Sequence, residues 1–320
     1  MAQIDYRRLG DSGLMVSTIG LGCNNFGRAG TATQSQAGTS AVIDTAVDAG
    51  ITVFDTADIY GAERGLSETL MGHALQGKRD RIVLASKFGM DMNGRNGPDW
   101  DARGSRRYIR LAVEASLRRL QTDWIDLYQL HTPDPNTPIE ETLQTLDDLI
   151  REGKVRYIGH SNLAGWQIAE AEFTARLHGH PRFISAQNEY SLLVRDAEEE
   201  VLPAVNAYGL GFLPFFPLYN GLFTGKFSRA GGPADSRIMM FRPHLAETAP
   251  WDVIEKYEAF CDEHGVTMLA ATFAWLLAQP GLTSVIAGAT RPEQVVQNTL
   301  EANEWQPTPE DVAWISDLFA

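Results

Sequence analysis

Cysteine is scarce in this chain of 320 residues, which contains only Cys23 and Cys261. Two cysteines cannot make the disulfide framework of a small secreted protein. The first eight residues, MAQIDYRR, also lack the apolar core of a signal peptide. These two absences predict a cytoplasmic location.

Long apolar runs and excess positive charge are also missing. The longest apolar run, Val266–Ala278, is too short to cross a bilayer and predicts a buried helix instead. Lysine and arginine number 27 against 41 acidic residues, which gives a net charge of −14. This balance argues against nucleic acid or a membrane as the main partner, so an anionic ligand would need a local basic pocket.

A dinucleotide-binding fingerprint, G-x-G-x-x-G, is present only in part. The segment GLGCNN at residues 20–25 has the first two glycines, but Asn25 stands where the third is required. An open Rossmann-like sheet is therefore the weaker of two α/β alternatives.

The chain does contain a regular alternation of short apolar runs and segments with helical periodicity. The expected strands are Ile19–Leu21, Ile51–Phe54, Ile82–Ser86, Trp124–Leu130, Val155–Ile158, Phe183–Gln187, Gly211–Pro217 and Ser284–Ile286. The expected helices are Thr39–Asp48, Ser67–Leu75, Arg107–Leu120, Ile139–Arg151, Ala164–Leu177, Glu198–Ala207, Trp251–Glu263 and Pro292–Ala302. Eight alternations predict one (β/α)₈ barrel domain over residues 1–320, preceded by a β-hairpin at residues 6–17.

Polar residues that follow barrel strands share one mouth, where such barrels carry their sites. Asp55 and Tyr60 follow the second strand, Lys87 the third and His131 the fourth. A buried Lys87 needs a partner such as Asp55. This pair should lower the pKa of Tyr60 and make it a general acid, while His131 orients a carbonyl oxygen. The alternative is a structural ion pair with an exposed tyrosine and a capping histidine.

Together these segments resemble the aldo-keto reductase family, in its potassium-channel β-subunit-like and bacterial branch. The matching motifs run nearly end to end: GLG at 20–22, FDTADIYG at 54–61, SKFG at 86–89, RRLQTDWIDLYQLH at 118–131, GHSN at 159–162, QNEYS at 187–191, GLFTGK at 221–226 and GATRPEQ at 288–294. The resemblance implies carbonyl reduction with a nicotinamide cofactor. It also implies that Tyr60 donates the proton, Asp55 and Lys87 tune it, and His131 positions the substrate.

The resemblance also implies a path for the cofactor. Polar groups of Ser161, Asn162 and Gln187 can hold the nicotinamide amide, and Phe215 can stack on its ring. Basic residues in the segment from Gly221 to Pro250, with Arg291 beyond it, favour a 2′-phosphate and therefore NADPH over NADH. The remaining expected contacts are Cys23, Asn24, Asp55, Phe216, Pro217, Leu218, Tyr219, Asn220, Lys226, Arg237, Gly288, Thr290, Gln294, Gln297 and Asn298. Phe216, Tyr219 and Gln297 depart from the residues that are usual in the family.

The substrate is expected to be a small carbonyl compound with little anionic character. The expected pocket residues are Asn24, Phe26, Tyr60, Phe88, His131, and Trp100 or Met240. His178 and His180 have no acidic or cysteine partner at ligand spacing, so no metal site is expected. His160 is either a polar contact behind the site or a residue of the barrel rim. Cys23 is either a reactive thiol near the cofactor or a small buried side chain.

Two other functions stay open beside an NADPH-dependent reductase. One is a regulatory subunit that keeps the fold and the cofactor but not turnover. The other is a lyase or isomerase in which Lys87 forms an imine with the substrate. The sequence does not decide between a monomer and a homo-oligomer.

Overall fold

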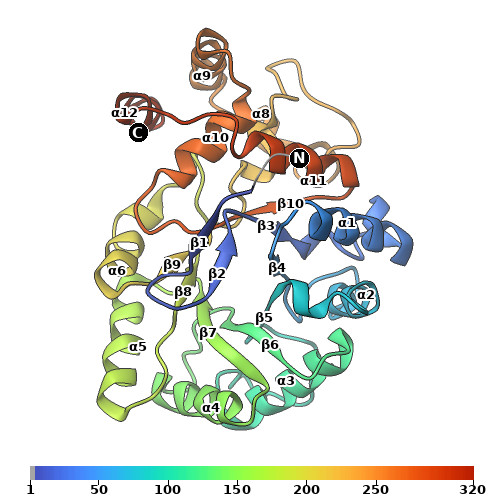
Figure 1. The fold of residues 1–320 in the computed structure, drawn as a ribbon, viewed down its shortest axis with the longest axis vertical. Coiled ribbons are helices and arrows are strands. Elements are labelled where there is room, and N and C mark those ends of the chain that lie inside the picture. The colour runs from blue at the N-terminus through green and yellow to red at the C-terminus, as the bar shows by residue number, and fades with distance from the viewer. Residues whose placement is uncertain (1–3) are drawn as a thin grey trace.

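The computed structural model describes residues 4–320, so residues 1–3 of the N-terminal segment lie outside the described part. Eight parallel strands curl into a barrel that is surrounded by helices (Figure 1). In the order in which they pair, the strands are β10 (Val285–Gly288), β3 (Ile19–Gly22), β4 (Val53–Asp55), β5 (Val83–Phe88), β6 (Ile125–Leu130), β7 (Val155–Ser161), β8 (Ser185–Gln187) and β9 (Gly211–Phe212). This order confirms the predicted (β/α)₈ fold and excludes the open Rossmann alternative.

Backbone hydrogen bonds close the ring between its first and last strands. Thr283 N donates to Phe212 O at 2.9 Å, and Ile286 N donates to Pro214 O at 3.3 Å. Alternate side chains of each strand then point inward or outward. Val53, Ala85 and other inward residues fill the barrel, while Phe54, Leu84 and other outward residues pack under the helices.

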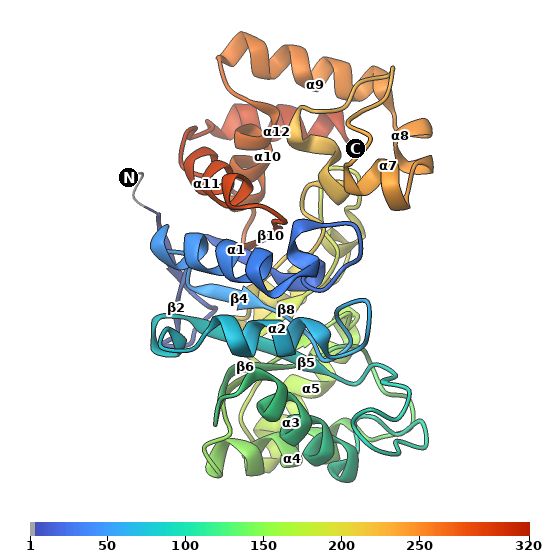
Figure 2. The same cartoon turned by 90° about the vertical axis from the view of Figure 1, so that its right-hand side faces the viewer.

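The predicted N-terminal hairpin is present as β1 (Tyr6–Arg8) and β2 (Met15–Ser17), which pair antiparallel. Leu9 and Val16 are buried against the inward residues of the barrel. The hairpin therefore plugs the end of the barrel where the strands begin. It lies opposite α7 (Arg237–Phe241) and α8 (His244–Glu247), which stand at the end where the strands finish (Figure 2).

The helices cover the outside of the sheet. Those that follow successive strands are α1 (Gln36–Asp48), α2 (Leu66–Ala74), α3 (Arg106–Leu120), α4 (Ile139–Arg151), α5 (Gly165–His178), α6 (Val201–Tyr208), α10 (Met268–Leu277) and α11 (Pro292–Glu301). Two more, α9 (Trp251–His264) and α12 (Pro309–Leu318), pack beyond α10 (Figure 1). No helix within residues 4–320 is both long and apolar enough to cross a membrane.

The structure differs from the sequence prediction mainly around β9. The strand expected at 211–217 has only two residues, and Phe215 continues it through a single bridge to Glu189. The segment from Gly221 to Pro250 has no clear helical period in the sequence, but it contains α7 and α8 and begins inside the 3₁₀ segment η5 (Tyr219–Thr224). The apolar run at 266–278 forms the buried helix α10, as predicted.

Candidate active site

A buried ion pair lies where β4 and β5 end. Lys87 Nζ donates to both carboxylate oxygens of Asp55, at 2.8 and 2.7 Å, and to the Thr56 carbonyl at 2.9 Å. It also contacts the Tyr60 hydroxyl at 3.3 Å. Gln187 adds a second donor to Asp55, at 2.9 Å. The predicted contact of Asp55, Lys87 and Tyr60 is therefore confirmed.

Charge and burial act in opposite directions on this cluster. Burial lowers the pKa of Lys87, but Asp55 and Tyr60 together raise it by more. The pKa of Lys87 therefore lies above its usual value. Burial raises the pKa of Tyr60, and Lys87 lowers it by less. The net pKa of Tyr60 is raised, so the expected lowering is wrong in this structure, because desolvation of the phenolate outweighs its attraction to one ammonium.

His131 follows β6 and faces the same phenol. Its ring and the ring of Tyr60 meet edge to face, with centroids 5.8 Å apart. Burial first, and then the charge of Lys87, lower the pKa of His131 to about 3. The imidazole is therefore neutral at ordinary pH and retains one N–H that can donate to an oxygen.

The backbone fixes Tyr60 between β5 and α2. Asp58 N donates to Lys87 O at 3.2 Å, and Ser67 N donates to Tyr60 O at 3.1 Å. Gly61 has φ 115°, and a Cβ there would lie 2.7 Å from the Cβ of Leu66. Only glycine suits this close turn, which sets the direction of the phenol.

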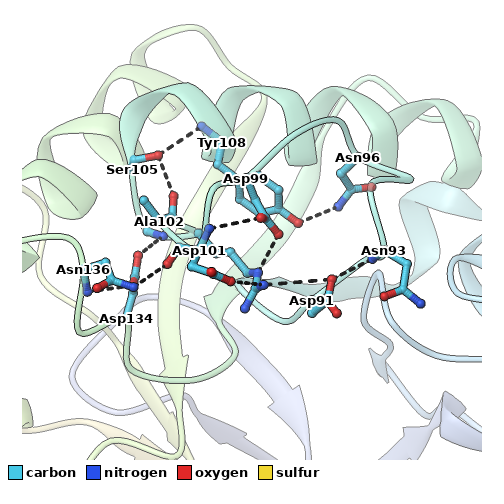
Figure 3. A network of polar contacts seen from close by, with 12 residues as sticks. Asp91, Asn93, Asn96, Asp99, Asp101, Ala102, Ser105, Tyr108, Asp134 and Asn136 are labelled. Atoms are coloured by element: carbon cyan, nitrogen blue, oxygen red, sulfur yellow. Dashed lines mark hydrogen bonds and ion pairs between the residues drawn. The ribbon is translucent and has the colours of Figure 1, made fainter.

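A second polar network lies behind this loop, on the outward face of the barrel wall. Arg119 donates to Glu68 at 2.7 Å and to Asn96 at 3.0 Å, and Asn96 donates to Asp58 at 2.8 Å. Figure 3 shows Asn96 reaching Tyr108 of α3. The network joins the Tyr60 loop to α2, to α3 and to the segment between β5 and α3.

That segment is held in place by carboxylates. Arg103 binds Asp99 at 2.7 Å and Asp101 at 2.9 Å. Asn136, which follows β6, donates to the Asp101 carbonyl at 2.7 Å (Figure 3). These contacts fix the segment beside the mouth of the barrel, although its residues do not line the cavity described next.

A cavity of about 420 Å³ opens at the strand ends, a size within the range of small-molecule sites. It includes most of the predicted site residues. Those lining it are Asn24, Asp55, Tyr60, His131, Ser161, Asn162, Gln187, Phe215, Phe216, Pro217, Leu218, Asn220, Lys226, Arg237, Met240, Gly288, Thr290, Gln294, Gln297 and Asn298.

Several predicted residues do not reach the cavity. Lys87 lies beneath it, and Tyr219 and Arg291 lie outside its lining. Arg291 instead pairs with Asp235 at 3.0 Å, which links the start of α11 to the segment before α7. Cys23 is completely buried, and burial raises the pKa of its thiol, so it is the small buried side chain of the two alternatives.

Two of the expected substrate contacts are wrong, because Phe26 and Phe88 are fully buried in the outer core. Of the alternatives Trp100 and Met240, Met240 lines the cavity and Trp100 is 68% exposed on the surface. Phe88 follows the inward-facing Lys87, so strand alternation turns it away from the barrel interior. His160 is likewise buried behind the wall, against Phe183. His178 and His180 pair separately with Glu140 and Asp147.

Residues that sequence reasoning missed also line the cavity. Arg28 comes from the loop after β3, and Asp235 and Phe241 come from the segment around α7. The loop after β3 has no periodic pattern, so the only available signal was a basic residue shortly after a barrel strand.

The backbone around β9 adopts conformations that are unfavourable for most side chains. Phe216, Tyr219 and Asn220 have φ values of 50°, 47° and 61°, and Asn162 across the mouth has 60°. Left-handed backbone outside glycine is uncommon and clusters at functional sites. The buried amide oxygen of Asn220 has no hydrogen-bond partner within residues 4–320, so it is free to bind a ligand.

The aldo/keto reductase family model matches residues 18–319. The chain belongs to this family. "Uncharacterized oxidoreductase YrpG" of Bacillus subtilis is 38% identical, with 99% of this chain and 96% of the relative covered. "Versiconal hemiacetal acetate reductase" of Aspergillus parasiticus is 31% identical, with 99% and 97% covered. "Probable voltage-gated potassium channel subunit beta" of Oryza sativa subsp. japonica is 33% identical, with 92% and 90% covered.

Family membership makes the chain an aldo-keto reductase, and its relatives indicate a carbonyl-reducing oxidoreductase. Such enzymes act on small molecules with a nicotinamide cofactor. The cavity fits that cofactor chemically. Amide and hydroxyl groups of Ser161, Asn162 and Gln187 line the cavity, while Arg237 and the unpartnered oxygen of Asn220 can receive the rest of the cofactor.

Proposed function

We propose that this aldo-keto reductase reduces aldehydes and ketones to alcohols with NADPH, and that Tyr60 is the proton donor. One observation carries the proposal. Lys87 is held between the carboxylate of Asp55 and the hydroxyl of Tyr60, at the floor of a cavity that His131 also lines. The relative named as a reductase supports the same reaction class.

The electrostatics suit a donor that must hold its proton until the substrate arrives. Burial keeps the pKa of Tyr60 above its usual value, so the phenol is protonated at neutral pH. Lys87 then stabilises the phenolate as the proton leaves. The neutral His131 donates a hydrogen bond to the carbonyl oxygen and holds it beside the phenol.

NADPH would supply the hydride to the carbonyl carbon. Ser161, Asn162 and Gln187 would bind its carboxamide, and Phe215 would pack on the ring. Lys226 and Arg237 would neutralise phosphate, and Gln294, Gln297 and Asn298 would contact the adenosine end. Asn24, Gly288 and Thr290 also line the cavity and would contact the cofactor.

The test compares wild type with Tyr60→Phe in NADPH consumption on a panel of aldehydes, ketones and quinones. Loss of a positioned general acid should lower kcat by about 10²- to 10⁴-fold. The control is the affinity for NADPH, which is measured by the quenching of protein fluorescence. This affinity should be nearly the same in the two proteins. Equal rates for the two proteins would exclude Tyr60 as the donor.

A cofactor-binding regulatory subunit is the second candidate, because a relative carries the name of a channel subunit. It predicts tight NADPH binding with no turnover on any member of the panel. Imine chemistry at Lys87 is less favoured. Its ammonium is fully buried and its pKa is raised, so the neutral amine that such chemistry requires is disfavoured. Borohydride trapping of a substrate on Lys87 would be needed to revive it.

A further inference from the structure

Arg28 is a cation in the cavity that the proposed reaction does not use. It lies in the loop after β3, and its carbonyl accepts from Thr31 Oγ1 at 2.9 Å. The guanidinium contacts the Asn24 carbonyl at 3.5 Å and the Asn24 side-chain oxygen. It also stands 5.7 Å from the ring centre of Phe241 on α7.

The charge of Arg28 is not neutralised. Within residues 4–320, Arg28, Arg237 and Arg242 form no ion pair with a carboxylate, although the chain as a whole is strongly acidic. Burial lowers the pKa of Arg28, and the charge of Arg242 lowers it further. Burial, then Arg28 and Arg242, lower the pKa of Arg237 to about 10. Arg28 and Arg237 line the cavity, and the repulsion between them would be relieved if an anion bound there.

Arg237 and Arg28 have different neighbours within this cluster. Arg237 lies over Phe216, at 4.9 Å from its ring centre, and reaches Asn25 at 3.4 Å. Arg28 is instead joined to the reacting end through Asn24. The Asn24 side chain accepts from Arg28 and also lies near the Tyr60 hydroxyl, whose pKa it lowers slightly against the larger effect of burial. One side chain therefore separates the guanidinium from the proton donor.

We propose that Arg28 binds the carboxylate of the substrate, so that the preferred substrates are aldehydes or ketones that also carry a carboxylate. This inference rests on the proposed function. A carbonyl oxygen held by Tyr60 and His131 leaves the rest of a short molecule in the cavity, within reach of Arg28. A guanidinium matches a carboxylate with two parallel hydrogen bonds. Reduction adds hydride to the carbonyl carbon and a proton from Tyr60 to the oxygen, and the carboxylate is unchanged.

The substrate class expected from sequence changes accordingly. The sequence predicted a substrate with little anionic character. The loop from Gly27 to Thr33 brings Arg28 there because it folds back on itself, with Gly27 N donating to Thr33 O at 2.8 Å. α7 packs over this loop, since a Cβ on Gly30 would lie 2.8 Å from the end of Met240.

The experiment compares 4-carboxybenzaldehyde with its methyl ester, which differ in charge but carry the same aldehyde. Wild type should have a kcat/KM at least about tenfold higher for the acid, mainly through KM. Arg28→Met should remove most of this preference. Arg229→Met is the matched control. Arg229 is an exposed arginine paired with Asp252 and Glu255 outside the cavity, and its loss changes the net charge equally.

Three results would overturn the inference. These are equal kcat/KM for acid and ester in wild type, equal losses for both in Arg28→Met, or a weakened NADPH affinity that accounts for the loss. The last result would assign Arg28 to a cofactor phosphate. Failure of the proposed function looks different, because neither aldehyde is then reduced. In that case the binding of 4-carboxybenzaldehyde is measured by calorimetry. Binding to wild type that is lost in Arg28→Met supports the inference, and absence of binding to wild type overturns it.

Discussion

Ser86 and Lys87 are neighbours on β5, yet they belong to two different polar networks on opposite faces of the barrel wall. Lys87 points inward and binds Asp55 beneath the cavity. Ser86 points outward and donates to Glu68 at 2.5 Å, and Glu68 in turn binds Arg119. Both networks combine a buried carboxylate with a cation, so composition alone does not distinguish them.

What distinguishes them is what each cation can reach. The inward network ends at the Tyr60 hydroxyl, on a surface open to a ligand. The outward network ends in protein, at Asn96 and Asp58. Burial and Glu68 raise the pKa of Asp58 well above its usual value, and Arg119 offsets this only in part. A buried ion pair is therefore evidence for chemistry only where an ionisable group faces a cavity.

Lys87→Met, in the inward network, should have the largest effect, because it lowers both stability and activity. It leaves Asp55 as an uncompensated buried carboxylate, which costs about 3–5 kcal/mol of unfolding free energy, and it should lower kcat by about 10²-fold or more. Urea denaturation and NADPH consumption measure the two effects. The double variant Lys87→Met with Asp55→Asn removes both charges, so it should regain much of the stability but none of the activity. Recovery of turnover in the double variant would contradict the role of Lys87.

Arg119→Met should affect stability more than activity. Removing the partner of Glu68, a fully buried carboxylate, should again cost about 3–5 kcal/mol. Tyr60 is only indirectly attached to this network, through Asp58, so kcat should fall by less than about tenfold while NADPH affinity is kept. Arg118→Met, an exposed neighbour on α3, is the control and should be close to wild type. A loss of activity as large as that of Lys87→Met would refute the distinction between the two faces.

Much of the inward face could be predicted because parallel strands in a barrel finish at one mouth. Asp55, Lys87 and His131 each lie at the end of an apolar run. The order of the strands is therefore enough to predict that these side chains lie close together. The same rule shows how one error arose. Phe88 follows Lys87, and alternation along the strand places it on the outward face, where the structure has it.

The remaining features depend on quantities that a linear pattern does not carry. The direction of the Tyr60 pKa follows from a competition between burial and the Lys87 charge, and burial is known only once the loop is folded. Arg28 reaches the cavity through a non-periodic loop that depends on local turns. α7 and α8 are too short to give a helical period, so the segment around them reads as a loop.

His160 extends the comparison to β7, where it points outward beside the inward-facing Ser161. Both of its ring nitrogens are buried without a partner within residues 4–320, and burial lowers its pKa to about 3 from a usual 6.5. Between these values the unfolded chain binds a proton that the folded protein does not. Stability must therefore fall as pH drops through 6.5 towards 3, by roughly 2 kcal/mol at pH 5 for this group.

His160→Leu should remove that share of the acid sensitivity, since leucine is of similar size and does not titrate. Unfolding free energies measured in urea between pH 5 and 7.5 should change less with pH than in wild type. The residual slope should include His131, whose pKa is also about 3. His73→Leu, at an exposed position on α2, is the matched histidine-to-leucine control. An unchanged slope in His160→Leu would mean that the buried imidazole binds its proton at the same pH in the folded protein as in the unfolded chain.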